Sequence, residues 1–387
     1  MQLGHAPGSI SPSRVGDRLA APGSDEAVAY ELLVSYLLAP EELGELVGDQ
    51  PDYRVDQIRD WLYRTPVLDA QDMTNLPGDL RDEISSRLWP FEVEMEQVAD
   101  GETTRKWLFR APDGAAIEAV LMGYPRRATL CISSQAGCAL GCTFCATGQF
   151  GFERHLEPGE IVAQVAYAQA FLRQIGMPGV PDHLTNIVFM GMGEPLANYR
   201  RVREAIRRMV EVMGMSARSI TVSTVGMVPG INQLADEPWP VSLAISLHAA
   251  DDELRTSLVP INKRYPIAEL EAAAAEYFEK KRRRVSIEWT MMEGVNDTLD
   301  QADKLASIAR RLRAHVNLIA LNPTPLSEAK PSTQLHIEEF ANALKRRRVN
   351  VTVRDTRGRD IDAACGQLRA QSSPPGSSAL IEIGVGD

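Results

Sequence analysis

From residue 128 onward, short apolar runs alternate with longer amphipathic segments, and this alternation constrains the fold more than any other feature. Seven runs have the length and composition of buried strands, at 128–133, 186–190, 219–223, 241–247, 285–291, 316–321 and 350–354. Helical periodicity lies between most of them, at 158–174, 198–213, 266–281, 299–313 and 334–347. Strands that alternate with such helices predict a parallel sheet. Roughly six units favour an α/β fold with a partial (β/α)6 TIM-like barrel over a full eight-unit barrel.

Outside this pattern, the composition and periodicity of the sequence change several times. The first residues are polar and rich in Gly, Ser and Pro, a helical pattern follows, and Pro112-Asp-Gly114 then separates two strand-like runs as in a hairpin. We therefore expect a disordered tail at 1–27, a small helical domain at 28–91, accessory strands at 92–127, the barrel at 128–368 and a flexible tail at 369–387.

Composition and charge limit the class of protein. No apolar run is long enough for a membrane span or a secretory signal, so a cytoplasmic protein is expected. The net charge of −11 argues mildly against a nucleic-acid partner, because the overall field would repel phosphates. Basic residues nevertheless cluster at 200–208, 280–284 and 345–348, which indicates either solvated helix ends or local phosphate-binding surfaces.

Three of the five cysteines, Cys138, Cys142 and Cys145, follow the first barrel strand with the spacing C-x3-C-x2-C. Thiolates hold iron–sulfur clusters, usually four at a time. Three thiolates leave one iron of a four-iron cluster open to the amino and carboxylate groups of S-adenosylmethionine. Gly137 and Gly141 would let the loop bend so that the three side chains converge.

Zinc is the competing interpretation of this motif. It needs four ligands, often from paired C-x2-C units. Cys131 is available as a fourth ligand but lies inside the preceding strand, and the nearest histidine, His155, is not at a zinc spacing. The spacing therefore favours the cluster.

Polar motifs follow the later barrel strands, where the carboxyl ends of parallel strands gather. Gly191-Met-Gly193-Glu194 follows the second strand, and its glycines would let a ligand approach the backbone. The other candidates for a cofactor pocket are Ser223, Ser246, Leu247, His248 and Asn322. Each of these is also an ordinary turn or helix-cap residue, and only their shared rim favours a ligand pocket.

Cys365 lies in a polar, Gly-bracketed loop after the last strand, which should return to the barrel mouth. Cys131 lies at the end of the first strand, beside the same mouth. A lone cysteine is often a small buried hydrophobe. The alternative is that the two cysteines form a reactive pair.

The cluster motif on this fold resembles the radical S-adenosylmethionine superfamily. Longer stretches are similar to one family within it, the dual-specificity ribosomal and transfer RNA adenine-C2 methyltransferases. They are Thr129–Cys138, Gly191–Leu196, Ser246–Ala249, Asp360–Leu368 and, in the helical domain, Asp56–Tyr63 with Met73–Pro77. The resemblance covers residues 28–368. It implies one [4Fe-4S] cluster per chain and two S-adenosylmethionine molecules per turnover, with the amino group of the latter at Gly193 and Glu194.

The resemblance also implies a role for each remaining cysteine. Cys365 takes a methyl group from one S-adenosylmethionine, and a radical from a second one activates that methyl for addition to C2 of adenine. Cys131 then releases the product by forming a transient disulfide with Cys365. Glu118 matches the family's proton acceptor, with Cys131 as a rival for that step. Glu118 could equally be an exposed strand carboxylate.

The resemblance implies 23S rRNA and transfer RNA as substrates, recruited with the help of the helical domain. It further implies a monomer that draws electrons from an external, flavodoxin-like donor. Three other functions stay open. One is the related adenine-C8 methyltransferase of the antibiotic-resistance type, another is a radical enzyme that acts on protein or a small molecule, and the third is a non-enzymatic zinc-binding RNA adaptor.

Overall fold

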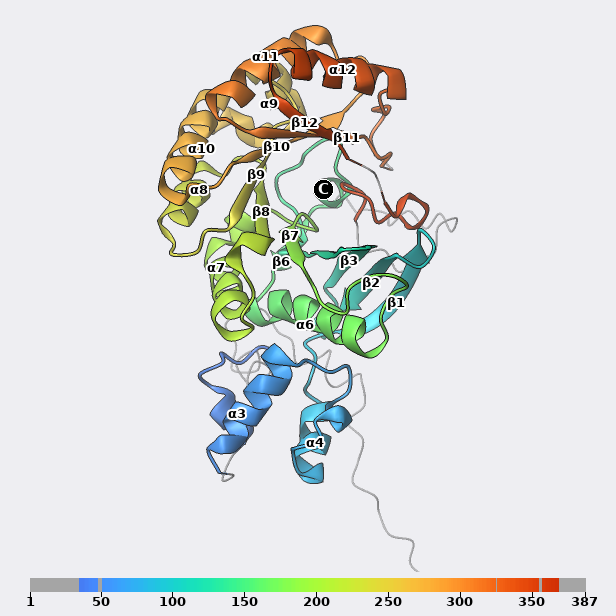
Figure 1. Ribbon diagram of the computed structural model, residues 1–387, viewed down its shortest axis with the longest axis vertical. Helices are drawn as coiled ribbons and strands as arrows, with labels where there is room; N and C mark the ends of the chain where they lie inside the picture. Colours follow the sequence, from blue (N-terminus) through green and yellow to red (C-terminus); the bar gives the residue numbers. More distant parts are fainter. Residues whose placement is uncertain (1–34, 48–50, 325, 355–356, 369–387) are drawn as a thin grey trace, which may run out of the picture.

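The computed structural model describes residues 35–47, 51–324, 326–354 and 357–368 (Figure 1). The predicted tails at 1–27 and 369–387 lie outside these residues. Among the described helices, none is both long and apolar enough to cross a membrane.

Within the described residues, ten strands form one sheet in the order β1-β2-β3-β4-β7-β8-β9-β10-β11-β12. They are β1 (Glu92–Ala99), β2 (Thr104–Arg110), β3 (Ala116–Tyr124), β4 (Arg127–Cys131), β7 (Asn186–Phe189), β8 (Ile220–Thr224), β9 (Ser242–Ser246), β10 (Ser286–Met291), β11 (His315–Ala320) and β12 (Asn350–Val353). Pairing is antiparallel from β1 to β4 and parallel from β4 to β12. The sheet curves strongly and, as far as it is described, β1 and β12 do not pair, so the barrel is open (Figure 1).

Helices cover the outer face of the parallel strands (Figure 1). They are α6 (Pro158–Gln174), α7 (Tyr199–Arg207) with the π-helical turn η5 (Arg208–Val212), α8 (Val228–Asp236), α9 (Asp252–Leu258), α10 (Ile267–Lys281), α11 (Leu299–Arg311) and α12 (Gln334–Arg346). The barrel part of the chain also contains short helical turns, namely α5 (Ala146–Gln149), η4 (Pro195–Asn198), η6 (Ala217–Ser219), η7 (Pro260–Lys263) and η8 (Arg359–Ile361). The predicted α/β class and parallel sheet are confirmed. The short helices α8 and α9 were not predicted, because they span too few turns for a clear periodicity.

A small helical lobe lies beneath α6 (Figure 1). It contains η1 (Leu43–Leu46), α3 (Tyr53–Arg59), η2 (Asp60–Arg64), η3 (Ala70–Asp72) and α4 (Gly78–Ser85). The buried guanidinium of Arg208 donates hydrogen bonds to the carbonyl oxygens of Tyr36 and Leu38, at 3.1 and 3.0 Å. A Cβ on Gly159 of α6 would come within 2.1 Å of the Tyr36 oxygen. The lobe therefore packs tightly against the barrel helices.

Two strand features were not foreseen. Strand β1 extends the accessory hairpin, but its residues alternate charged and apolar side chains that are mostly solvent-exposed, so the sequence lacks a buried pattern. A second, two-stranded sheet pairs β5 (Gln135–Gly137) with β6 (Phe152–His155) and encloses the cysteine loop. Strands this short carry little periodicity of their own.

Candidate functional site

The cysteine loop runs between β5 and β6 and bends at two glycines. Gly137 and Gly141 have φ of 74° and 62°, in the left-handed region that favours glycine. A Cβ on Gly137 would also come within 2.2 Å of the Gly151 carbonyl oxygen. The Cys138 amide donates to that same oxygen at 2.6 Å. Gly137 and Gly141 therefore allow the bend of the cysteine loop that was predicted from the sequence.

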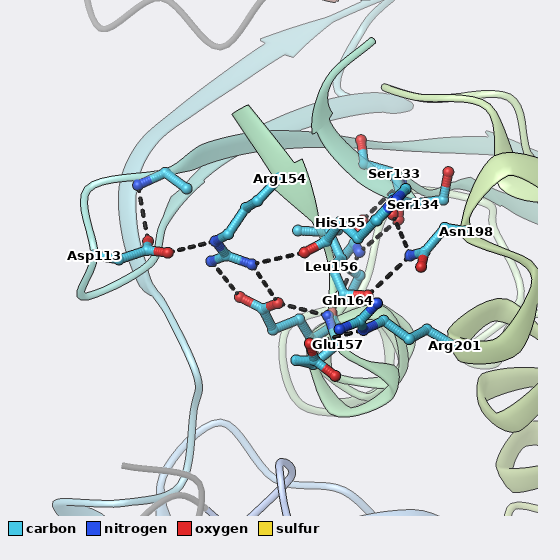
Figure 2. A network of polar contacts seen from close by, with 12 residues as sticks. Asp113, Ser133, Ser134, Arg154, His155, Leu156, Glu157, Gln164, Asn198 and Arg201 are labelled. Atoms are coloured by element: carbon cyan, nitrogen blue, oxygen red, sulfur yellow. Dashed lines mark hydrogen bonds and ion pairs between the residues drawn. The ribbon is translucent and has the colours of Figure 1, made fainter. Parts of the chain in front are cut away.

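A buried polar network anchors both ends of this loop to α6 and η4 (Figure 2). The Gln164 side chain accepts from the Ser133 amide and donates to the Ser133 carbonyl, at 2.9 and 3.0 Å. On the other strand, the Arg154 guanidinium makes two bonds of 2.8 Å to the Glu160 carboxylate. Asn198 ties the two ends together by donating to carbonyl oxygens of both segments. The loop is thus held on a rigid base.

The three cysteines of the loop line one cavity of about 150 Å³, which opens to solvent. Its lining also includes Gly193, Glu194, Ser223, Ser246, His248, Glu288 and Cys365. Burial raises the pKa of Cys142, and that of Cys138 to about 12, and the neighbouring thiols add to both shifts. Thiols that are this costly to ionise suit a site where bound cations stabilise the negative charge of the thiolates.

Among the described residues, no three His, Cys, Asp or Glu side chains converge closely enough to hold a single metal ion. A four-iron cluster makes a different demand, because each of its thiolates binds a different iron. Three sulfurs spread around one cavity, with a ligand space beside them, fit such a group.

Gly193 and Glu194 follow β7 and form one wall of this cavity. Gly193 has φ of 95°, and the Glu194 amide donates to the Gln135 side chain at 2.8 Å. The buried Glu194 carboxylate accepts from the amides of Leu196 and Val225, at 3.0 and 2.9 Å. Burial nevertheless raises the pKa of Glu194 to about 7. An ammonium group in the cavity would stabilise this carboxylate.

The polar rim continues on the next two strands. Ser223 at the end of β8 and Ser246 at the end of β9 lie with their hydroxyl oxygens 3.4 Å apart. His248 lines the same cavity, whereas the Leu247 side chain lies in the hydrophobic core. Leu247 can therefore reach a ligand only through its backbone.

His248 is buried and neutral. Its Nδ1 accepts from the Thr290 amide at 3.0 Å, and its ring packs edge-on against Phe144. Burial and the nearby Arg255 lower the pKa of His248 to about 3. The residue also has φ of 60°, which asparagine tolerates better than most residues.

Acid should destabilise the wild type more than the variant His248→Asn. Between about pH 6.5 and pH 3 the unfolded chain binds a proton at this position and the folded chain does not. The free energy of unfolding therefore falls as pH falls, by about 1.4 kcal/mol per pH unit from this group. Asparagine keeps an acceptor for Thr290 but does not titrate. Urea unfolding at pH 7.5 and pH 5 should show the variant losing about 2 kcal/mol less. Equal losses would contradict the assignment.

A second cavity, of about 230 Å³, shares Cys365 with the first. It contains Cys131, and Cys365, Met190, Glu288 and Ile319 line both cavities. Cys365 is solvent-exposed within this space, where surrounding protein still raises its pKa. Burial and the nearby Cys365 raise the pKa of Cys131. The structure thus brings the two cysteines, 234 positions apart in the sequence, to one cavity.

Hydrogen bonds tie the Cys365 loop to the cysteine loop. The Ala146 amide donates to the Gly366 carbonyl at 2.8 Å, and the Thr147 hydroxyl donates to the Leu368 carbonyl at 2.6 Å. Asn322 donates to the Cys365 carbonyl at 3.1 Å and lines the second cavity. The predicted cofactor residue Asn322 therefore lies with Cys131 and Cys365 in the second cavity and is not part of the lining of the first.

Glu118 is buried on β3, so it is not the exposed strand carboxylate considered above. Its carboxylate pairs with the Lys106 ammonium at 3.0 Å, and Lys106 also donates to the Asp362 carbonyl. Neither of the two described cavities has Glu118 in its lining. The ion pair links β2 to β3 within the accessory hairpin, and the Lys106 bond to the Asp362 carbonyl joins that hairpin to the segment that carries Cys365.

The basic clusters lie on the outer helices and largely pair with acidic side chains. Arg207 and Arg208 bind Glu204, Lys280 binds Asp236, and Arg347 binds Asp303. Other cations line the second cavity, namely Arg127, Arg354 and Arg357. Sequence reasoning missed these three because it considered only the longer basic runs, whereas Arg127 belongs to a pair with Arg126, and Arg354 and Arg357 alternate with other residue types.

Comparisons with known proteins agree with this geometry. The family model of the radical SAM superfamily matches residues 132–306. "Probable dual-specificity RNA methyltransferase RlmN" of Frankia alni is 50% identical over 341 residues, covering 86% of this chain and 81% of the relative. The protein of the same name from Nocardioides sp. is 48% identical over 351 residues, covering 86% and 93%. A crystal structure of a radical SAM methyltransferase from Sphaerobacter thermophilus superposes with a TM-score of 0.82 at 47% identity, covering 88% of this chain and 100% of that one.

The open barrel, the loop of three cysteines and the matching family model define a radical SAM enzyme. This class implies an iron–sulfur cluster and S-adenosylmethionine, and it favours the cluster over the zinc alternative. Within the class, the chain belongs to the RlmN family of dual-specificity RNA methyltransferases.

Proposed function

We propose that this protein methylates C2 of adenine in 23S rRNA, at adenine 2503, and in transfer RNA, at adenine 37. The relatives named above support an RNA substrate. The position of Cys365 carries the proposal, because its sulfur stands between the cavity of the three loop cysteines and the cavity of Cys131. A group that must pass from a cofactor to a base needs a carrier at such a junction.

The first cavity holds the cofactors in this scheme. Cys138, Cys142 and Cys145 hold the [4Fe-4S] cluster, and Glu194 takes the ammonium of S-adenosylmethionine. Ser223, Ser246 and His248 line the space left for its nucleoside. When bound, these groups supply a methyl group and the means to remove a hydrogen atom from it.

Cys365 is the covalent carrier. Its thiolate attacks the methyl carbon of S-adenosylmethionine, so that a sulfur–carbon bond forms and S-adenosylhomocysteine leaves. C2 of adenine is electron-poor, which makes direct transfer of a methyl cation to it unfavourable. A carbon radical on the methyl group carried by Cys365 has no such difficulty, and Met190 and Ile319 line both cavities together with Cys365.

Cys131 completes the reaction. The adduct first loses one electron, which the oxidised cluster would take when it is bound, and the C2 proton. The Cys131 thiolate then attacks the Cys365 sulfur, the sulfur–carbon bond breaks with its electron pair going to the transferred carbon, that carbon takes up a proton to become the methyl group, and a disulfide remains. Two electrons from an external donor then restore both thiols. For removal of the C2 proton, Cys131 lines the cavity directly, whereas Glu118 would act from behind Lys106.

Anaerobic reconstitution with iron, sulfide and a reductant tests the function. Methyl-labelled S-adenosylmethionine and fragments of 23S rRNA or transfer RNA should give label on adenine, and mass spectrometry of the digested RNA should place it at C2. Label at C8 would instead indicate the resistance-type activity. Absence of label from RNA, with label on protein or a small molecule, would refute an RNA methyltransferase.

A further inference from the structure

The two cavities share a carboxylate to which no role has been given, that of Glu288, which lines the second cavity together with Cys131 and Cys365. The side chain extends from the middle of β10 and is only 3% exposed. Its Oε1 accepts from the Asn317 amide at 2.8 Å and from the Ser286 hydroxyl at 3.0 Å. Its Oε2 is buried and has no hydrogen-bond partner among the described residues. A buried carboxylate oxygen without a donor is costly, so this atom indicates a ligand that donates.

The nearest cation does not satisfy this oxygen. The Arg354 guanidinium lies 3.8 Å from Oε2, which is beyond a hydrogen bond, and its own side chain is 45% exposed. Asn317 and Ser286 hold the carboxylate from the opposite oxygen, which fixes its orientation. Oε2 is therefore a positioned acceptor in a cavity that also contains Cys131 and Cys365.

The arginines that line the same cavity indicate which other chemical groups the ligand carries. Arg127 and Arg357 both lie over the Tyr124 ring, with guanidinium carbons 4.2 and 4.5 Å from its centroid. Arg354 is the third arginine of the lining. Guanidinium groups held in this way suit phosphate oxygens. A nucleotide whose base carries an amino group matches both features.

We propose that Glu288 accepts a hydrogen bond from the 6-amino group of the target adenine, and that Arg127, Arg354 and Arg357 bind the flanking phosphates. This assignment rests on the proposed function, which places an adenine in this cavity. Glu288 is then the residue that distinguishes adenine from a 6-oxopurine, whose oxygen would face the carboxylate and be repelled.

The variant Glu288→Gln offers a matched test. Asn317 and Ser286 both donate to Oε1, so the amide oxygen takes that position and the amide NH2 replaces Oε2 in the cavity. The acceptor that faces the base becomes a donor of nearly the same size. The variant should therefore favour hypoxanthine, whose 6-oxygen accepts, at the expense of adenine.

The experiment measures kcat/KM of the reconstituted enzyme on RNA hairpins that differ only in the target base. The bases are adenine, hypoxanthine, purine and N6,N6-dimethyladenine. Wild type should prefer adenine at least tenfold over each of the others. Glu288→Gln should lower the ratio of adenine to hypoxanthine at least tenfold. Arg354→Gln should raise KM for all four hairpins alike and leave the ratio unchanged, as expected for a phosphate contact.

The outcomes separate this assignment from the proposed function. If wild type methylates adenine but accepts purine and dimethyladenine equally well, Glu288 does not read the amino group, whether or not the variant folds. An unchanged base preference in a folded Glu288→Gln protein would overturn the assignment in the same way. Failure of wild type to methylate any hairpin would overturn the proposed function and this assignment with it.

Discussion

Replacement of Cys365 by alanine is expected to abolish RNA methylation while leaving the protein folded and able to bind S-adenosylmethionine. The side chain is exposed within the cavities, so its loss removes little packing. Its carbonyl bond to Asn322 is made by the backbone and survives the substitution. Loss of a covalent carrier leaves no alternative acceptor for the methyl group, and a fall of about 10³-fold or more is expected. Label transfer from methyl-labelled S-adenosylmethionine to RNA measures it.

Cys131→Ala is the matched control, because it removes the other sulfur of the same cavity. That variant should still methylate Cys365 and attack the base. Without Cys131 to break the sulfur–carbon bond, it should accumulate protein covalently joined to RNA, seen as a shifted band in a denaturing gel. The double variant should give neither product nor shifted band. Cys365→Ala protein that keeps more than a tenth of wild-type methylation would refute the carrier role.

Much of the barrel could be predicted because its strands are buried on both sides. Runs such as 285–291 and 316–321 are apolar and β-branched, and each lies within one residue of an observed strand. The helix at 158–174 was predicted to the residue, since a proline at its start and a long apolar face mark it clearly. Local pattern and tertiary burial agree in this part of the chain.

Only one part of the proposed catalytic site, the cysteine loop, could be predicted from the sequence. The spacing of the three cysteines predicts a shared loop, because these residues are close to one another both in the sequence and in space. The second cavity gives no such signal. Glu288 comes from β10, Arg127 from β4 and Arg357 from the segment after β12, and only the curvature of the sheet brings them to one cavity. A charged residue within an apolar strand, such as Glu288, was the single available hint.

For the basic runs, the sequence left two interpretations open, and the structure fits the helix-end interpretation. Runs of arginine and lysine at 200–208 and 280–284 are conspicuous in the sequence, yet most of them lie on outer helix faces opposite carboxylates. The overall charge of −11 supplies enough acidic partners to neutralise such runs. The arginines that line the second cavity belong to shorter groups, 126–127 and 354–359, which the sequence does not mark as parts of one site.

Arg255→Met is expected to cause the largest loss of stability among single substitutions near the first cavity. The Arg255 side chain is fully buried on α9. Its guanidinium donates to the carbonyl oxygens of Val225 and Leu247, at 2.6 and 3.2 Å, and to the Asn262 side chain at 2.7 Å. It thus connects the segments that follow β8 and β9. Ser223 and Ser246 lie at the ends of these two strands, and His248 lies in the segment after β9. Methionine fills a similar volume but removes the donor to the Val225 carbonyl and to the Asn262 side chain, whereas the Leu247 carbonyl still accepts from the Ala249 amide. Each acceptor left without a donor costs about 1–3 kcal/mol, so the free energy of unfolding should fall by about 2 kcal/mol or more.

Urea unfolding of the full chain measures this loss, and equilibrium binding of S-adenosylmethionine by the reconstituted protein measures its effect on the pocket. Arg310→Met on α11 is the matched control, since that arginine is exposed on an outer helix, and it should change stability by no more than about 0.5 kcal/mol. Arg255→Lys separates charge from geometry, because one ammonium cannot reach acceptors on three segments at once. If the lysine variant keeps wild-type stability, the buried charge and not the bridging geometry holds these strand ends. If the methionine variant does so as well, Arg255 has no structural role there.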